Sequence, residues 1–326
     1  MDDTRATSQR HTPVLLDECL DMLAPALDAP SALLVDCTLG MGGHTEAALR
    51  RFPRLSVIGI DRDPQAIALA SERLLPFGER FRAVHTTYDR VDEVVARHSP
   101  SGLADGILMD LGVSSLQLDE ADRGFSYAAD APLDMRMDPT KGPSAADLLA
   151  SATEAEIAKI LRVYGEERFA SRIARRIVRK REEAPLERTG QLVDIVRDAI
   201  PAPARRTGGN PSKRTFQALR VAVNDELRIL ERALPAALSS LRIGGRLVIE
   251  SYQSLEDRLV KEAFRAGSIL DVPVDLPIIP ESEEPPLKLL TRGAVLADEE
   301  ERARNPRSAS VRLRGVELVR DWKEPS

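Results

Sequence analysis

Short apolar runs alternate with amphipathic segments along the first third of the chain. The apolar runs have the length of strands and lie at residues 33–37, 56–61, 81–86 and 106–111. Helical periodicity is found between them at 45–52, 64–75 and 89–98, and ahead of them at 14–28. Strands that alternate with helices in this way predict an open α/β sheet of mainly parallel strands.

The alternation stops in the middle of the chain and resumes later. Residues 122–224 contain no convincing strand, and their periodicity predicts helices at 145–150, 154–164, 166–181 and 189–200. Helices at 225–241 and 255–266 and strands at 246–251 and near 310–314 are predicted to follow. We interpret the middle block as an all-α domain inserted into a Rossmann-like sheet.

This interpretation predicts the domain organisation. We expect a disordered segment at 1–10, an α/β domain formed by 11–113 and 225–326, and an inserted helical domain at 114–224. Proline and acidic residues are frequent at 271–304, which predicts a long, partly flexible surface connection within the second part of the α/β domain.

A glycine-rich turn between the first two predicted strands is the strongest candidate for a ligand site. Gly40, Gly42 and Gly43 let the backbone approach a ligand closely, and Asp61 lies at the tip of the next strand, where a carboxylate accepts hydrogen bonds from ribose hydroxyls. Both a dinucleotide and S-adenosylmethionine fit this outline, and an ordinary βα turn is the structural alternative. Thr45 occupies the position of the third glycine of the dinucleotide pattern.

The acid that precedes this loop also bears on the choice of ligand. Asp36 would repel a pyrophosphate, whereas the ammonium and sulfonium groups of S-adenosylmethionine are positive. The methyl donor is therefore favoured over a dinucleotide.

Composition narrows the class of protein further. The chain has 326 residues, of which 43% are hydrophobic and 30% charged, as is typical of a soluble globular protein. No apolar stretch is long enough to span a bilayer, and the polar N-terminus lacks a signal-peptide core, so we expect a cytoplasmic protein without a membrane partner. The two cysteines, Cys19 and Cys37, and the four scattered histidines show no metal-ligand spacing, and we expect no structural zinc.

Positive charge is concentrated locally although the net charge is −6. Residues 199–224 contain no acid, and this segment includes Arg205, Arg206, Lys213 and Arg214 around a Gly-Gly-Asn-Pro sequence. We interpret it as a flexible basic loop that contacts nucleic-acid phosphates. Arg168, Arg172, Arg175 and Arg179 share one face of the predicted 166–181 helix, where a solvated, ion-paired surface is the favoured interpretation.

Three side chains at predicted strand ends are candidates for the reaction itself. Asp110 ends the fourth strand, where it would accept hydrogen bonds from an amine and orient it for an in-line displacement. Tyr252 would stack on an extruded base, and Tyr88 would cover an adenine; packing in the core is the alternative for each. Neither cysteine lies at a suitable strand tip for covalent catalysis at a pyrimidine carbon, which favours amine chemistry.

Several longer motifs resemble those of the bacterial ribosomal RNA small subunit methyltransferase H family over nearly the whole chain. They are Gly-Gly-His at 42–44, Ile-Asp-Arg-Asp-Pro-Gln-Ala at 60–66, Asp-Leu-Gly-Val-Ser-Ser at 110–115, Arg-Gly-Phe-Ser at 123–126, Pro-Leu-Asp-Met-Arg-Met-Asp at 132–138, Tyr-Gly-Glu-Glu-Arg-Phe-Ala at 164–170, Arg-Thr-Phe-Gln-Ala-Leu-Arg at 214–220 and Ser-Leu-Glu-Asp-Arg at 254–258.

The resemblance implies a fold, a reaction and a set of site residues. The fold would be a class I S-adenosylmethionine-dependent methyltransferase sheet with a helical substrate-recognition insert, and the reaction N4-methylation of a cytidine in the decoding region of 16S rRNA in the small ribosomal subunit. The cofactor positions would be Gly42, Gly43, His44, Asp61, Tyr88, Asp110 and Gln117. A dimer is compatible with the chain, whose sequence does not determine the oligomeric state.

One segment departs from the family pattern, and alternative functions stay open. The family usually has Ser-Phe-His before Ser-Leu-Glu-Asp-Arg, whereas this chain has Ser-Tyr-Gln with Glu250 ahead of it; Gln253 thus removes a titratable group. The alternatives are an assembly factor that binds RNA but retains only a relic donor pocket, an NAD-dependent oxidoreductase, and a methyltransferase that acts on DNA or protein.

Overall fold

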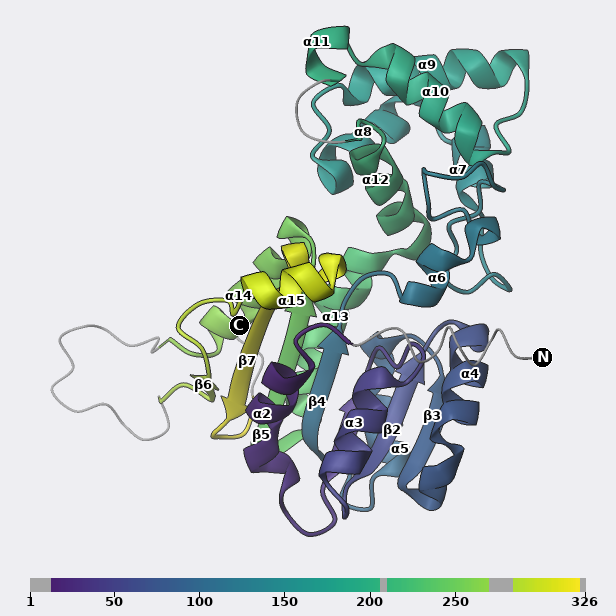
Figure 1. Cartoon of the computed structure of the whole chain (residues 1–326). Coiled ribbons are helices and arrows are strands. Elements are labelled where there is room, and N and C mark those ends of the chain that lie inside the picture. Colours follow the sequence, from purple (N-terminus) through teal and green to yellow (C-terminus); the bar gives the residue numbers. More distant parts are fainter. Residues whose placement is uncertain (1–12, 206–209, 270–283, 323–326) are drawn as a thin grey trace, which may run out of the picture. The chain divides into compact units, whose positions relative to one another are not determined.

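The computed structural model describes residues 13–205, 210–269 and 284–322 (Figure 1). These residues form two compact units. One comprises the described parts of Met1–Gly112 and Arg228–Ser326, and the other comprises Val113–Leu227. We call them the α/β unit and the helical unit. The segment 1–10, which we expected to be disordered, lies outside the described residues.

The α/β unit is built on a seven-stranded sheet of order β3-β2-β1-β4-β5-β7-β6. The strands are β1 (Leu33–Asp36), β2 (Ser56–Asp61), β3 (Phe81–His85), β4 (Ala104–Asp110), β5 (Leu241–Ser251), β6 (Leu287–Leu289) and β7 (Arg312–Leu318). The pairs among β1 to β5 are parallel, whereas β7 is antiparallel to both β5 and β6. The predicted α/β fold class is confirmed.

Helices cover both faces of this sheet because alternate strand residues face opposite sides. Leu34 faces a cluster that includes residues of α2 (Leu16–Leu27), α3 (Gly43–Arg51) and α4 (Pro64–Leu74). Val35 faces the opposite cluster, which includes residues of α5 (Val91–His98), α13 (Glu226–Ser239) and α14 (Ser254–Ala266). Because helices cover both faces of the sheet, ligands bind at the edge where the parallel strands end.

The helical unit has its own apolar core. Its helices are α6 (Ser115–Asp119), α7 (Ala145–Ser151), α8 (Glu154–Gly165), α9 (Ala170–Glu183), α10 (Thr189–Ala199), α11 (Ala202–Arg205) and α12 (Lys213–Asn224). Ser144 and Thr153 start α7 and α8 with capping boxes, so each helix begins where its side chains satisfy the first amide groups. On α9, Ile173 and Ile177 are buried, whereas Arg172, Arg175 and Arg179 are exposed, as is Arg168 just before the helix.

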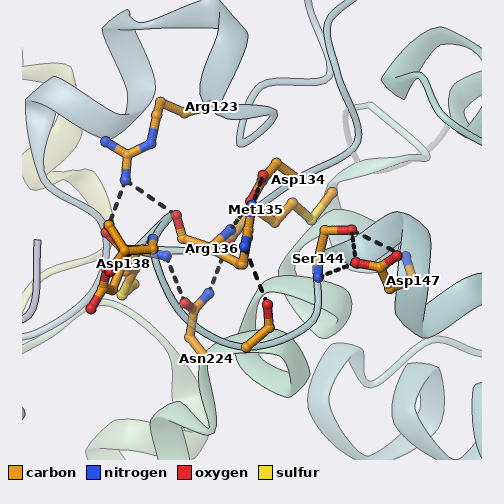
Figure 2. Close-up of polar contacts among 11 residues, drawn as sticks. Arg123, Asp134, Met135, Arg136, Asp138, Ser144, Asp147 and Asn224 are labelled. Carbon is orange, nitrogen blue, oxygen red and sulfur yellow. Dashed lines mark hydrogen bonds and ion pairs between the residues drawn. The ribbon is translucent and has the colours of Figure 1, made fainter.

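A folded loop at 132–138 is held by side chains from two other parts of the helical unit (Figure 2). Asn224 Nδ2 donates to the Met135 carbonyl at 2.7 Å, and Asn224 Oδ1 accepts from the Met137 amide at 2.8 Å. Arg123 Nη2 donates to the carbonyls of Arg136 and Met137. Met135 has φ 62°, a left-handed conformation that costs energy for a side chain of this kind. These hydrogen bonds therefore hold the loop in a conformation that it would not adopt alone.

Two expectations need correction. The basic segment predicted as a flexible loop contains the regular helix α12, in which Phe216 and Leu219 are buried on one face. Within the Pro- and acid-rich segment, the described residues 284–304 contain β6 and α15 (Glu299–Arg304), and Val295 pairs with Leu313 of β7. Backbone pairing with β7 orders this part despite its composition. None of the helices in the described ranges is long and apolar enough to cross a membrane.

Candidate active site

The glycine loop follows β1 and leads into α3, as the sequence predicted. Gly42 has φ 78° and precedes the first residue of α3. A Cβ on Gly42 would lie 3.0 Å from the Leu74 side chain, and one on Gly43 would lie 2.7 Å from Pro13. Gly43 therefore requires glycine for reasons of space, and Gly42 for its backbone conformation in a tightly packed position.

Asp61 ties this loop to the end of β2. Its Oδ2 accepts a hydrogen bond from the Gly40 amide at 2.8 Å, and its Oδ1 accepts one from the Asp63 amide at 2.8 Å. Burial raises the pKa of the Asp61 carboxyl to about 6, against the opposing effect of these hydrogen bonds. Each carboxylate oxygen retains a second lone pair, so Asp61 can accept further hydrogen bonds from a ligand.

Asp36 holds the other end of the loop rather than facing a ligand openly. The carboxyl group is buried and accepts hydrogen bonds from the Thr45 hydroxyl at 2.7 Å and from the Thr38 amide at 3.2 Å. Thr45, which stands where a dinucleotide loop has glycine, is thus a structural partner of Asp36.

The reacting-group candidates lie at the ends of neighbouring strands. Asp110 ends β4, its side chain is 30% exposed, and burial raises the pKa of its carboxyl to about 6. The Tyr252 hydroxyl is near enough to interact with the Asp110 carboxyl, and burial raises the pKa of that hydroxyl well above its usual range. Strand order reverses between β1 and β4, so Asp110 occupies the position where open α/β sheets bind ligands.

The Ser-Leu-Glu-Asp-Arg motif positions Tyr252. Glu256 Oε2 accepts hydrogen bonds from the amides of Tyr252 and Gln253, both at 3.0 Å. Asp257 pairs with Arg314 of β7, with 2.8 Å between Oδ1 and Nε. Glu256 and Asp257 therefore fix the turn between β5 and α14, a role that sequence reasoning did not assign to them.

The other predicted cofactor residues, Tyr88, His44 and Gln117, differ in their contacts. Tyr88 is half-buried after β3, where it packs against the core of the α/β unit. His44 is the second residue of α3, and its ring is buried rather than open to a ligand. Gln117 belongs to the helical unit, where its Oε1 accepts from the Ser114 amide at 3.1 Å to cap α6.

The basic candidates all belong to the helical unit. Lys213 and Arg214 are exposed in the first turn of α12, and Arg214 also donates to the Glu166 carbonyl at 2.9 Å. Arg205 is half-buried and donates to the Ile200 carbonyl. Arg206 lies outside the described residues.

This combination of sheet order, glycine loop and acidic strand ends defines a class I, Rossmann-like methyltransferase. A profile of the MraW methylase family matches residues 8–319, and the chain belongs to that family. It is an enzyme of the methyltransferase class, and its methyl donor is S-adenosylmethionine.

Relatives over the full length carry the same name. The protein called Ribosomal RNA small subunit methyltransferase H in Beutenbergia cavernae is 60% identical over 95% of this chain and 93% of its own length. The protein of that name in Nocardioides sp. is 59% identical over 94% of this chain and 96% of its own length. The one in Streptomyces avermitilis is 56% identical over 98% of this chain and 100% of its own length.

Proposed function

We propose that this chain transfers a methyl group from S-adenosylmethionine to the N4 amine of a cytidine in the decoding region of 16S rRNA. The observation that carries the proposal is Asp110, a partly exposed carboxyl at the end of β4 with the Tyr252 hydroxyl beside it. The names of the full-length relatives support ribosomal RNA of the small subunit as the substrate.

The site fits the methyl donor in shape and charge. S-adenosylmethionine supplies an electrophilic methyl group on a positively charged sulfur. The glycine loop offers backbone groups at close range, and Asp61 offers acceptor lone pairs for ribose hydroxyls. The carboxyl of Asp110 at the same edge of the sheet complements positive charge. With His44 buried, its contact with the donor would come from the backbone.

The chain's own groups then orient the acceptor. An exocyclic amine is a weak nucleophile because its lone pair is delocalised into the ring. When the Asp110 carboxylate accepts a hydrogen bond from the N–H of this amine, it holds the amine in position and favours the tetrahedral geometry that attack requires. The Tyr252 hydroxyl lies beside the Asp110 carboxyl, and its ring is our candidate for stacking on the base.

Both cysteines argue for nitrogen rather than ring carbon as the methylated atom. Methylation of a pyrimidine carbon needs a thiolate nucleophile, and Cys19 and Cys37 are fully buried, with the pKa of each thiol raised well above its usual range by burial. Neither is poised to attack a base, which supports direct transfer to an amine without a covalent intermediate.

The decisive experiment supplies labelled S-adenosylmethionine and 30S subunits that lack the native decoding-site modification. Nuclease digestion and mass spectrometry then locate the label. We expect it on N4 of a single cytidine. Donor binding without any labelled nucleotide would instead support the alternative of a non-catalytic assembly factor.

Donor affinity should fall as the pH is lowered through about 6. The carboxylate form of Asp61 accepts the ribose hydrogen bonds, and its pKa is raised to about 6, so protonation removes an acceptor below that pH. Affinity then falls by at most about tenfold per pH unit for this one group. Isothermal titration calorimetry from about pH 5 to pH 8 measures the change.

Because Asp110 shares this pKa range, the control must separate the two carboxyls. Asp61→Asn removes one titrating group, so its donor affinity should be weaker at neutral pH and less dependent on pH. Parallel pH profiles for the wild type and Asp61→Asn would contradict the assignment.

Lys213 is the test residue for phosphate contact because its side chain is exposed and makes none of the hydrogen bonds or ion pairs found among the described residues. Lys213→Ala should weaken binding to 16S rRNA fragments and lower the slope of log K against log salt by about 0.7 to 0.9. Filter binding at several salt concentrations measures that slope. Lys159→Ala, an exposed lysine of α8, is the matched control. An unchanged slope would remove Lys213 from the RNA interface.

A further inference from the structure

A second group of polar side chains lies buried in the α/β unit, and the proposed reaction does not use it. It consists of Cys19 on α2, His44 on α3 and Glu250 on β5. One potential ligand atom of each residue lies within 4.8 Å of those of the other two, and all three residues are buried. Because the three residues lie on separate elements that meet only in the folded unit, no spacing motif in the sequence indicates this cluster.

Glu250 is the unusual member of this cluster. It is fully buried, and neither carboxyl oxygen has a hydrogen bond of ordinary geometry from the described residues. The Cys19 thiol is near enough to interact with the carboxyl, but a thiol is a weak donor. Burying a carboxyl without good hydrogen-bond partners costs free energy. A bound ligand that contacts this carboxyl would offset that cost.

His44 has the orientation of a metal ligand. Its Nε2 lies 3.6 Å from Glu250 Oε2 and 3.3 Å from the Val14 carbonyl oxygen, and its Nδ1 lies 3.9 Å from Asp110 Oδ2. Burial lowers the pKa of the imidazole, which favours the neutral form that binds metals. The second ring nitrogen of a histidine ligand commonly donates to a carboxylate, and the carboxyl nearest to His44 Nδ1 is that of Asp110, at a distance beyond that of a direct hydrogen bond.

We propose that Cys19, His44 and Glu250 bind a zinc ion, with the Val14 carbonyl oxygen available for the fourth position. Thiolate, imidazole and carboxylate form a donor set that zinc accepts in tetrahedral sites. The ion would supply the positive charge that the Glu250 carboxylate lacks, and binding would release the proton of the Cys19 thiol.

Zinc at this position would be structural, and it would lie behind the reaction site rather than in it. It would join α2, α3 and β5 and would fix the ring of His44 with its Nδ1 proton directed at Asp110. The inference rests on this cluster alone and does not depend on the identity of the methylated RNA.

Zinc content and a cobalt spectrum of the full chain test the proposal. The tag-free protein is stripped with a chelator, incubated with zinc chloride, dialysed and analysed by mass spectrometry for bound metal. We expect one zinc per chain and a higher melting temperature with zinc. Cobalt in place of zinc should produce a thiolate-to-metal charge-transfer band.

Matched variants identify the ligands. Cys19→Ser and Glu250→Gln should each weaken zinc binding by at least about tenfold, and Cys19→Ser should also lose the cobalt band. Cys37→Ser changes the other buried cysteine and should bind zinc as the wild type does. Failure of the wild-type chain to bind zinc, or a cobalt spectrum without a thiolate band, would overturn the proposal even if a variant failed to fold.

Discussion

Replacing Asp110 with alanine should lower the rate of methyl transfer to the ribosomal substrate by about 10²–10³-fold. The carboxylate is the group that we place against the acceptor amine, and positioning contributes most of the acceleration in an in-line displacement. Single-turnover methylation of unmodified 30S subunits at saturating donor measures this rate.

Two further variants separate the roles of Asp110. Asp110→Asn retains the shape of the side chain but not its charge, and should recover only part of the rate. Asp92→Ala removes an exposed carboxyl from α5 and should leave the rate unchanged. If Asp110→Ala weakens donor affinity by the same factor as it lowers the rate, Asp110 binds the donor and does not orient the acceptor.

The parallel strands could be predicted because they are buried on both faces and are therefore continuous apolar runs. β1 and β4 are almost entirely buried. Each apolar run is followed by the acid that ends the strand, Asp36 in β1 and Asp110 in β4, as the pattern indicated. β5 starts at Leu241, whereas the predicted strand starts at 246, after Gly244 and Gly245, a residue type that is uncommon inside strands. In the structure these glycines lie within the strand, where the pairing with β4 shifts register between Ala104 and Gly106.

The helix α12 was missed for a different reason. Its basic residues and the Gly-Gly-Asn-Pro sequence ahead of it favoured a loop, and local composition outweighed a periodic signal that was present. Thr215, Phe216, Ala218 and Leu219 are all buried, with the spacing of one helical face. Tertiary packing against the core of the helical unit decides the conformation of this segment.

The positions of site residues at strand ends could be predicted, whereas groupings that depend on helix packing could not. The position of Asp61 and Asp110 at one edge of the sheet could be predicted because the ends of parallel strands meet there, whatever the rest of the fold does. The cluster of Cys19, His44 and Glu250 could not, because its members are brought together by the packing of α2 and α3 on the sheet. Glu250 was visible only as a departure from the family pattern, which carried no indication of its partners.

Replacing Asn224 with alanine should lower the free energy of unfolding of the helical unit by about 2–4 kcal/mol. The Asn224 side chain is 2% exposed, and its removal leaves the Met137 amide and the Met135 carbonyl without their partner in a buried position. The left-handed conformation of Met135 adds strain that the remaining contacts must hold (Figure 2). Urea denaturation followed by circular dichroism measures the loss.

The two units make the functional consequence of this substitution specific. Asp61 and Asp110 belong to the α/β unit, whereas Asn224 belongs to the helical unit, so Asn224→Ala should retain donor affinity while methylation of the ribosomal substrate falls. Asn224→Asp keeps an acceptor for the Met137 amide but places a buried carboxyl oxygen against the carbonyls of Met135 and Arg220, and its stability should be no higher than that of Asn224→Ala. If Asn224→Ala lost donor affinity together with RNA methylation at a temperature where it stays folded, the helical unit would contribute to donor binding as well as to recognition of the RNA.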